Sequence, residues 1–222
     1  MLQLFASIVS VAIENAIAVK NMEASHELNE DYRMRMEVLN KQLIESSKEL
    51  EYLSLYDSVT ALPNRSLFHD RLMRDIAEAR QNNSSIAVLL IDIDRFKDIN
   101  DSLGHDHGDA LLNQIARRFE SEVSVHETLA RLGGDEFIIV LPGHDQLQAE
   151  QRAARFLKGL KSAFVIEQNH IVVNASIGIA VYPQHGNSIS SLLSHADYAM
   201  YEAKNSKLDV CVYDPDEDHL AQ

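Results

Sequence analysis

The feature of the sequence that most restricts its fold is the order of apolar segments between residues 86 and 182. Their periodicities follow the order strand, helix, strand, strand, helix, strand, beginning with the unbroken apolar run from Ile86 to Ile91. This order is the split βαβ pattern, which predicts an antiparallel sheet with its helices packed on one face. The sequence therefore predicts an α+β fold.

The same patterns give the expected extent of each element. Helices are expected over residues 64–80, 146–162 and 188–204, and another helix carries the apolar stripe of residues 111–119. Strands are expected over residues 86–91, 128–132, 137–141 and 210–213. A hairpin is expected to pair residues 164–167 with 171–182 around Gln168 and Asn169.

A glycine pair, Gly133-Gly134, precedes the acidic pair Asp135-Glu136 between the second and third strands. Adjacent glycines favour a two-residue hairpin turn, which would hold both carboxylates at a corner of the sheet. In the split pattern the first strand lies beside the third, about 4.8 Å away, so Asp92 reaches the same edge. Carboxylates that converge on one edge suit magnesium, although such a turn taken alone is better explained as a solvated surface turn. The sequence therefore predicts a magnesium site here.

The helix after the first strand is expected to begin around Gly108 and Asp109, after a turn-rich stretch over residues 100–109. Its free N–H groups and positive dipole would suit an anion or a polar loop that grips a ligand. Lys97 follows Asp92 by five residues and could reach phosphate oxygens. Taken singly, Lys97 is better explained as a solvated surface lysine.

Composition narrows the classes of function. The formal net charge of −14 argues against non-specific binding to nucleic acid or to an anionic membrane, because both reward basic surfaces. Cys211 is the only cysteine, which excludes an intrachain disulfide and suits a reducing compartment. The first nineteen residues contain Glu14 and Asn15 and are too short to span a membrane. We therefore expect a cytoplasmic protein without membrane contact in this chain.

Residues 4–56 contain neither proline nor glycine and carry a long helical pattern. Such a helix is too long for one small domain, so the pattern favours a parallel, dimerising stalk over an amphipathic helix that lies on its own domain. The inward positions of one unbroken heptad frame are Leu4, Ile8, Val11, Asn15, Ala18, Met22, Ser25, Asn29, Tyr32, Met36, Leu39, Leu43, Ser46, Leu50 and Leu53. Polar members of this seam weaken it while fixing its register.

Five motifs in order resemble those of the GGDEF family of diguanylate cyclases. They are DIDRFKDIND at residues 92–101, GHDHGD at 104–109, RLGGDEF at 131–137, SIGIA at 176–180 and ADYAMYEAK at 196–204. The resemblance extends from Asp57 to about Asp214, and the ordered set is far more specific than any single motif. The fold it implies is a palm-like sheet similar to that of nucleotide cyclases and polymerases.

The resemblance implies condensation of two GTP molecules into cyclic di-GMP, at a site shared by two facing domains that each hold one GTP. Magnesium would be the metal, with manganese as an alternative. The metal-binding residues implied are Asp92, Ile93 through its carbonyl group, Asp135 and Glu136. Asp135 would accept the hydroxyl proton, and the catalytic set would include Glu136 and Lys97. The substrate-binding residues implied are Phe96, Asn100, His105, Asp109 and Lys204.

The sequence departs from the family pattern at three places. Ala61 replaces a glycine of the T-G-L-P-N-R turn, and Leu208 replaces an arginine that contacts phosphate. Ser124 to Glu127 replace the R-x-x-D motif that binds inhibitory product in many relatives. The missing arginine keeps a second interpretation open: a GTP-binding regulatory module that makes no product and controls an attached EAL phosphodiesterase domain.

The ends of the chain suggest a larger context. Residues 4–18 resemble the final helix of GAF sensor domains, and the acidic tail resembles the linker that leads into EAL domains in hybrid relatives. The expected organisation is a signalling helix over residues 1–56, a GGDEF domain over 57–214 and an acidic tail or linker over 215–222. A sensor domain upstream and an EAL domain downstream are the candidate partners, beside a second copy of the chain.

Overall fold

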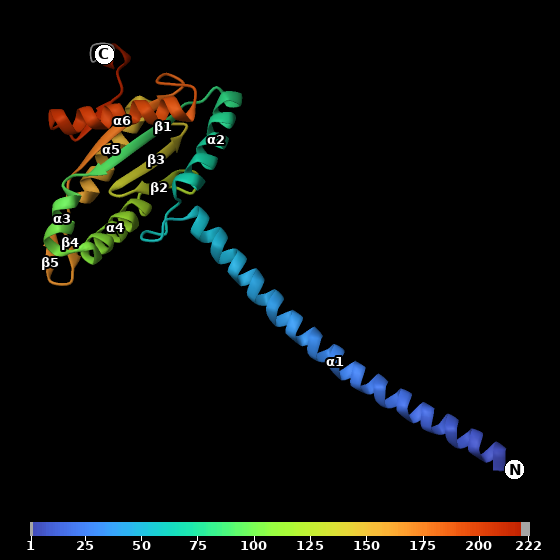
Figure 1. The fold of residues 1–222 in the computed structure, drawn as a ribbon. Helices are drawn as coiled ribbons and strands as arrows, with labels where there is room; N and C mark the ends of the chain where they lie inside the picture. The colour runs from blue at the N-terminus through green and yellow to red at the C-terminus, as the bar shows by residue number, and fades with distance from the viewer. Residues whose placement is uncertain (1, 219–222) are drawn as a thin grey trace. The chain divides into compact units, whose positions relative to one another are not determined.

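A computed structural model describes residues 2–218 (Figure 1). Its internal contacts divide the chain into two units, Met1–Tyr52 and Leu53–Gln222. The first unit is helical, and the second contains the sheet and the helices that pack on it. None of the described helices is both long and apolar enough to cross a membrane.

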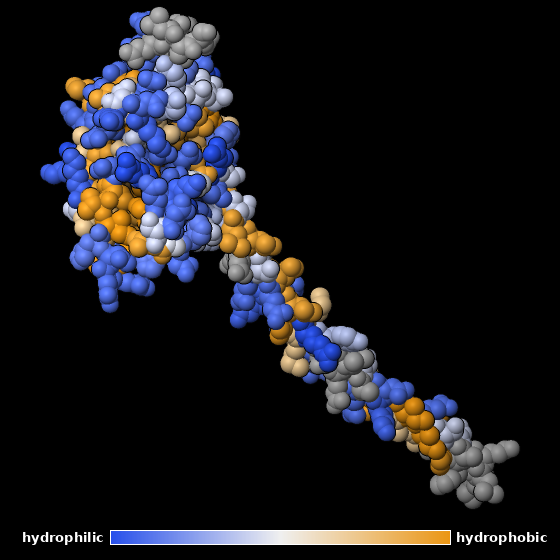
Figure 2. Space-filling model, turned by 60° about the vertical axis from the view of Figure 1, so that its left-hand side comes forward, coloured by the Kyte–Doolittle hydropathy of each residue, from blue (hydrophilic) through white to orange (hydrophobic). Residues whose placement is uncertain are grey.

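Helix α1 (Leu2–Leu55) is continuous over 54 residues, as the absence of proline and glycine predicted. Large apolar side chains at heptad positions are exposed on it, among them Met22, Leu43 and Leu50, which are 71%, 67% and 65% exposed. Figure 2 shows separate apolar patches along the helix. The side chains of Leu4 and Ile8 lie outside the described residues. Dimerisation through this seam stays a prediction.

A five-stranded sheet forms the centre of the second unit, with the strand order β2-β3-β1-β6-β7. Its strands are β1 (Ile86–Ile93), β2 (Thr128–Gly133), β3 (Glu136–Pro142), β6 (Ala175–Tyr182) and β7 (Val210–Val212). β1 pairs antiparallel with β3 and β6, which confirms that the first strand lies beside the third. The four strands within residues 86–182 are antiparallel to their neighbours, as predicted. β7, which lies outside that range, pairs parallel with β6 and makes the whole sheet mixed. The α+β fold class is confirmed.

Helices cover both faces of this sheet (Figure 1). They are α2 (Arg65–Asn82), α4 (His105–Glu120), α5 (Gln146–Leu160) and α6 (Ile189–Ser206). Alternate residues of β1 explain the two layers: Leu89 packs in the cluster with α4 and α5, while Val88 packs in the cluster with α2 and α6. The predicted one-sided packing is confirmed for α4 and α5, the two helices of the split βαβ unit, and α2 and α6 from outside that unit cover the other face.

The stretch over residues 100–109 is helical rather than turn-rich. α3 (Phe96–Leu103) and α4 are separated only by Gly104, whose φ of 89° places it in the left-handed region. α4 therefore begins at His105, a turn before the predicted start around Gly108. Small polar residues favour turns locally, but Phe96 and Leu111 are buried in the core and anchor both helices.

The predicted hairpin is partly wrong. β4 (Phe164–Ile166) pairs with β5 (Asn169–Ile171) across a turn at Glu167 and Gln168, so the turn lies one residue earlier than predicted. β5 and β6 are separate strands, because residues 172–174 belong to neither of them and β6 joins β1 in the main sheet. Pairing with the central strand buries all eight residues of β6. A single strand over residues 171–182 could not belong to both sheets.

Candidate active site

The turn between β2 and β3 presents the acidic pair. Gly133 pairs with Glu136, leaving Gly134 and Asp135 as a two-residue turn, as the glycine pair predicted. The φ angles of Gly133 and Gly134 are 139° and 55°, which side chains rarely allow. Asp135 therefore stands at the tip of the hairpin, and Glu136 is the first residue of β3.

The end of β1 lies directly beside this turn. Asp92 is the register partner of Glu136, and the Ile93 N–H donates to the Asp135 carbonyl oxygen at 3.2 Å. Asp92 is 9% exposed, while Asp135 and Glu136 are half-buried. The structure thus brings together the four residues predicted to bind the metal, here called the acidic edge: Asp92, Ile93, Asp135 and Glu136.

The carboxylates of the acidic edge perturb one another. Burial, and next the negative charge of Asp92, raise the pKa of Asp135 above its ordinary value, against the opposing effect of Lys204. Burial also raises the pKa of Glu136, followed by the charge of Asp197 on α6. Half-buried acids that resist ionisation in this way are stabilised as carboxylates by a cation placed among them.

Lys204 supplies positive charge at the acidic edge. Its Nζ donates to Asp92 Oδ1 at 2.7 Å, and this hydrogen bond raises the pKa of the lysine. Lys204 also lines a cleft of about 890 Å³, together with Lys207 and Leu208. The lysine predicted to hold phosphate therefore lies at the junction of the acidic edge and an open cleft.

The donor set of the acidic edge suits magnesium. Carboxylate oxygens and a backbone carbonyl are hard ligands, and magnesium completes its shell with water and substrate phosphate. Among the described residues, no group of three or more His, Cys, Asp and Glu side chains is placed so that it could hold a metal ion by itself. An ion that keeps several water or phosphate ligands fits this partial set better than a fully protein-ligated structural ion.

The predicted base-binding residues lie on α3 and α4. The buried Asn100 Oδ1 has no hydrogen-bond partner among the described residues. Gly108 adjoins it so closely that a Cβ there would stand 1.9 Å from that oxygen. Asp109 is exposed one residue further along α4. An unpaired buried acceptor beside a glycine is consistent with a site for a ligand that donates N–H groups.

Three other predicted residues have different surroundings. The Phe96 side chain is 7% exposed and packs in the core, so only its backbone can face a ligand. His105 lines a separate hollow of about 570 Å³ that it shares with Glu167 of the β4–β5 turn. Lys97 is exposed on the first turn of α3. The structure brings none of these three side chains into the acidic edge.

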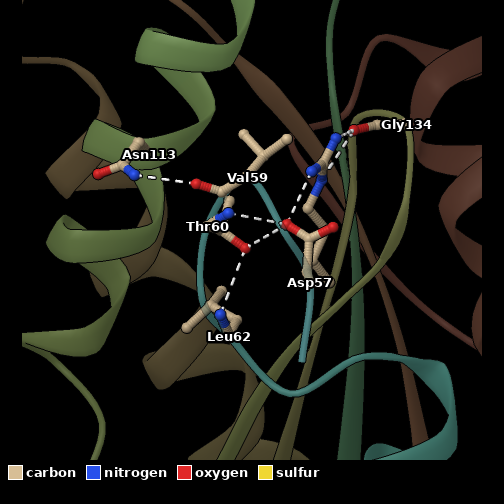
Figure 3. Close-up of polar contacts among 7 residues, drawn as sticks. Asp57, Val59, Thr60, Leu62, Asn113 and Gly134 are labelled. Carbon is tan, nitrogen blue, oxygen red and sulfur yellow. Dashed lines mark hydrogen bonds and ion pairs between the residues drawn. The ribbon is translucent and has the colours of Figure 1, made fainter. Parts of the chain in front are cut away.

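The sequence alone assigned no role to Arg131, although this residue begins the RLGGDEF motif. Its guanidinium donates to the Gly134 carbonyl oxygen and forms an ion pair with Asp57, as Figure 3 shows around the labelled Asp57 and Gly134. The available signal was a single arginine in an otherwise apolar strand, where burial of a charge requires partners.

The mixed sheet, its two helical layers and the acidic edge define an α+β domain. Residues 54–209 match the family model described as diguanylate cyclase, GGDEF domain, and the chain belongs to this family. The bifunctional diguanylate cyclase/cyclic di-GMP phosphodiesterase MucR of Pseudomonas aeruginosa is 40% identical over 171 residues, which are 77% of this chain and 25% of MucR. The diguanylate cyclase TpbB of the same organism is 37% identical over 183 residues, covering 80% of this chain and 42% of TpbB.

A solved structure agrees with these matches. The GGDEF domain of TpbB superposes with a TM-score of 0.72 at 36% identity, covering 75% of this chain and 99% of that chain. The chain spans only about a quarter to two fifths of the length of the curated relatives MucR and TpbB.

Proposed function

We propose that the protein is a cytoplasmic diguanylate cyclase that converts two GTP molecules into one cyclic di-GMP and two pyrophosphates. The observation that carries this proposal is the acidic edge, where Asp92 and Glu136 are register partners and Asp135 stands beside them. Membership of the GGDEF family supports the choice of substrate. The reaction forms a bond from each ribose 3′-oxygen to the α-phosphorus of the other GTP and releases pyrophosphate from each.

The acidic edge would hold magnesium through Asp92, Asp135, Glu136 and the Ile93 carbonyl group. A bound magnesium ion, or manganese in its place, would neutralise charge on the phosphate oxygens during phosphoryl transfer. Asp135 is the candidate acceptor of the 3′-hydroxyl proton, because it stands at the tip of the hairpin beside Asp92 and Glu136. Lys204 would orient the phosphate nearest the metal site, and Lys97 would meet the remaining phosphates.

The guanine base would bind at α3 and α4. Asn100 Oδ1 is a buried acceptor without a partner in the described part of the chain, and guanine offers an N–H group and an amino group as donors. The Asp109 carboxylate can accept from both at once. Phe96 would contribute through its backbone, and His105 would lie at the outer side of the nucleotide.

The proposed reaction needs a second copy of the chain, because each acidic edge activates one GTP only. Two domains would face each other so that each hydroxyl group meets the α-phosphate of the opposite GTP. The heptad seam of α1 would hold the two copies together and raise their effective concentration.

One observation favours a second candidate, a GTP-binding module that regulates an attached phosphodiesterase domain without making product. Leu208 lines the cleft beside Lys204 and lacks charge, and the relative MucR is bifunctional and far longer than this chain. Incubation with GTP and magnesium, followed by chromatography, separates the two candidates. The cyclase yields cyclic di-GMP, whereas the regulatory module binds GTP and leaves it intact.

A further inference from the structure

We propose that the Asp57–Arg131 ion pair positions the turn that carries Asp135 and joins this turn to the end of α1. This inference rests on the proposed cyclase activity and adds to it two positioning residues outside the acidic edge.

The guanidinium of Arg131 binds the turn directly. Its Nε and Nη2 donate to the Gly134 carbonyl oxygen at 3.0 and 2.6 Å, and the arginine is 8% exposed. The Gly134 carbonyl belongs to the planar peptide group that precedes Asp135. Fixing this plane therefore fixes the direction in which the Asp135 side chain leaves the turn.

The turn depends on such a contact because it is intrinsically flexible. Gly133 and Gly134 have the widest backbone freedom of any residue type. Within the described part of the chain, no atom other than those of the adjoining residues lies within 4 Å of the place where a Cβ on either glycine would stand. The turn is thus held at the Asp135 carbonyl by the Ile93 N–H and at the Gly134 carbonyl by Arg131. Without Arg131, only the end of the strand ladder would hold it.

Asp57 fixes the other side of the guanidinium. Its Oδ1 accepts from Arg131 Nη1 at 2.8 Å and from the N–H and hydroxyl groups of Thr60 at 2.8 and 2.7 Å. Burial acts to raise the pKa of Asp57, but the hydrogen bonds from Thr60 and Arg131 lower it below its ordinary value. The carboxylate therefore stays charged at neutral pH and keeps the arginine oriented toward the turn.

The loop that contains Asp57 is itself firmly anchored. Asn113 on α4 donates to the Val59 carbonyl oxygen at 3.0 Å (Figure 3). The Arg131 N–H donates to the Pro63 carbonyl oxygen at 3.0 Å. Asp57 also donates its N–H to the Leu62 carbonyl oxygen at 2.8 Å. This anchoring gives the Asp57 carboxylate a fixed position relative to both β2 and α4.

The same loop holds the last turn of α1. The Asn64 side chain donates to the Ser54 carbonyl oxygen at 2.8 Å. The backbone N–H of Asn64 donates to the Leu55 carbonyl oxygen at 2.9 Å. Asp57 follows Leu55, the last residue of α1, by two positions. Continuous contacts thus run from the end of α1 through Asp57 and Arg131 to Gly134. A displacement of that helix end would reach the turn by this route.

The test uses the single variants Arg131→Lys and Asp57→Asn and the double variant that carries both changes. Asn113→Ala is the matched control. Arg131→Lys keeps the charge but cannot bond both Gly134 and Asp57, whereas Asn113→Ala loosens the same loop without touching the turn. We expect Arg131→Lys to lower kcat by about 10- to 100-fold while the KM for GTP changes less than about twofold. Asp57→Asn should have a smaller effect that does not add to that of Arg131→Lys. Asn113→Ala should leave kcat within about twofold.

Hydrogen exchange separates positioning from general stability. Hydrogen exchange of the peptide over residues 131–137 should quicken in Arg131→Lys but not in Asn113→Ala, and this readout needs no activity. It therefore tests the inference even if the wild type makes no product and the proposed function fails. Unchanged exchange in Arg131→Lys, or an equal loss of kcat in Asn113→Ala, would overturn the proposal.

Discussion

Asp135 combines a functional position with a cost to folding. Burial and the charge of Asp92 raise its pKa above the ordinary value of 3.8, so the folded chain binds this proton more tightly than the unfolded chain does. The cost is absent below the unfolded pKa, grows as pH rises toward the folded pKa, and is fully present above it. Negative charge at this point therefore opposes folding at neutral pH unless a cation is bound.

Asp135→Asn should consequently stabilise the fold and abolish synthesis. We expect a higher Tm than the wild type at pH 7 in the presence of a chelator, because the amide removes the charge and keeps the shape. The difference should disappear at pH 3, where the acid is protonated in both the folded and the unfolded chain. Thermal unfolding at both pH values checks this. A Tm at pH 7 below that of the wild type would show that the charge is already compensated within the chain.

Glu127 is engaged in a local network that differs from the inhibitory motif of the family. Its Oε2 accepts from the Ser124 N–H at 2.8 Å and from Arg152 Nη2 at 2.7 Å. Ser124 has no charge to offer a phosphate, and losing a charge-assisted contact costs about 1.5–3 kcal/mol. That corresponds to more than about a tenfold loss of affinity.

We therefore predict that cyclic di-GMP does not bind strongly at Ser124–Glu127. Calorimetry with cyclic di-GMP on the Asp135→Asn variant checks this, because the variant disables the acidic edge and leaves this network intact. Low-micromolar binding that disappears in Glu127→Ala would show that a working inhibitory site exists here.

Among the helices and strands, the sequence predicted those that an apolar run or a turn motif marks locally. The runs of β1 and β3 and the glycine pair between β2 and β3 were enough to place Asp92 beside Glu136. The unbroken apolar run of β1 also signals burial on both faces, which would have predicted the second helical layer. This signal was used only to identify a buried strand.

Other elements could not be read from local patterns. α3 is an eight-residue helix of mostly polar residues, and its stability comes from Phe96 in the core rather than from propensity. The split between β5 and β6 depends on which strand pairs with β1, which is a tertiary contact. The role of Arg131 follows from its contacts with Asp57 and Gly134, and the contact with Asp57 joins residues far apart in the sequence.

The contact between β6 and α6 depends on Gly178. A Cβ at this position would stand 2.0 Å from the Ala196 carbonyl oxygen and 2.2 Å from the Met200 nitrogen, both backbone atoms that cannot move aside. Gly178→Ala should destabilise the domain by at least about 2 kcal/mol, because the helix must move away from the sheet.

Gly159→Ala is the matched control for Gly178→Ala. Its Cβ would meet Arg118 side-chain atoms at 3.8 Å, an ordinary contact, and alanine favours the helix there. Denaturant unfolding of both variants measures the difference. Equal stability of Gly178→Ala and the wild type would mean that the two elements pack less closely than described.

For the whole molecule, the proposed reaction requires two copies of the chain. Leu43 and Leu50 are 67% and 65% exposed in the single chain and occupy inward positions of the heptad frame. Leu43→Lys or Leu50→Lys should weaken association, because each would bury an unpaired charge in the seam. Synthesis by the wild type should rise more than linearly with protein concentration.

Sedimentation checks this prediction, with Lys41→Glu as a control that changes charge two residues away from Leu43 and outside the seam positions. The control should sediment as the wild type does. If both leucine variants also associate normally, the heptad frame is wrong.

The most direct measurement is product analysis after incubation of the wild type and Asp92→Asn with GTP and magnesium. Asp92 is a candidate metal ligand at the edge of the sheet, so its replacement should leave the circular dichroism spectrum unchanged while removing activity. We predict that the wild type yields cyclic di-GMP and two equivalents of pyrophosphate, and that Asp92→Asn yields neither. Synthesis by Asp92→Asn at the wild-type rate, or intact GTP after incubation with a wild type shown to bind it, would contradict the account.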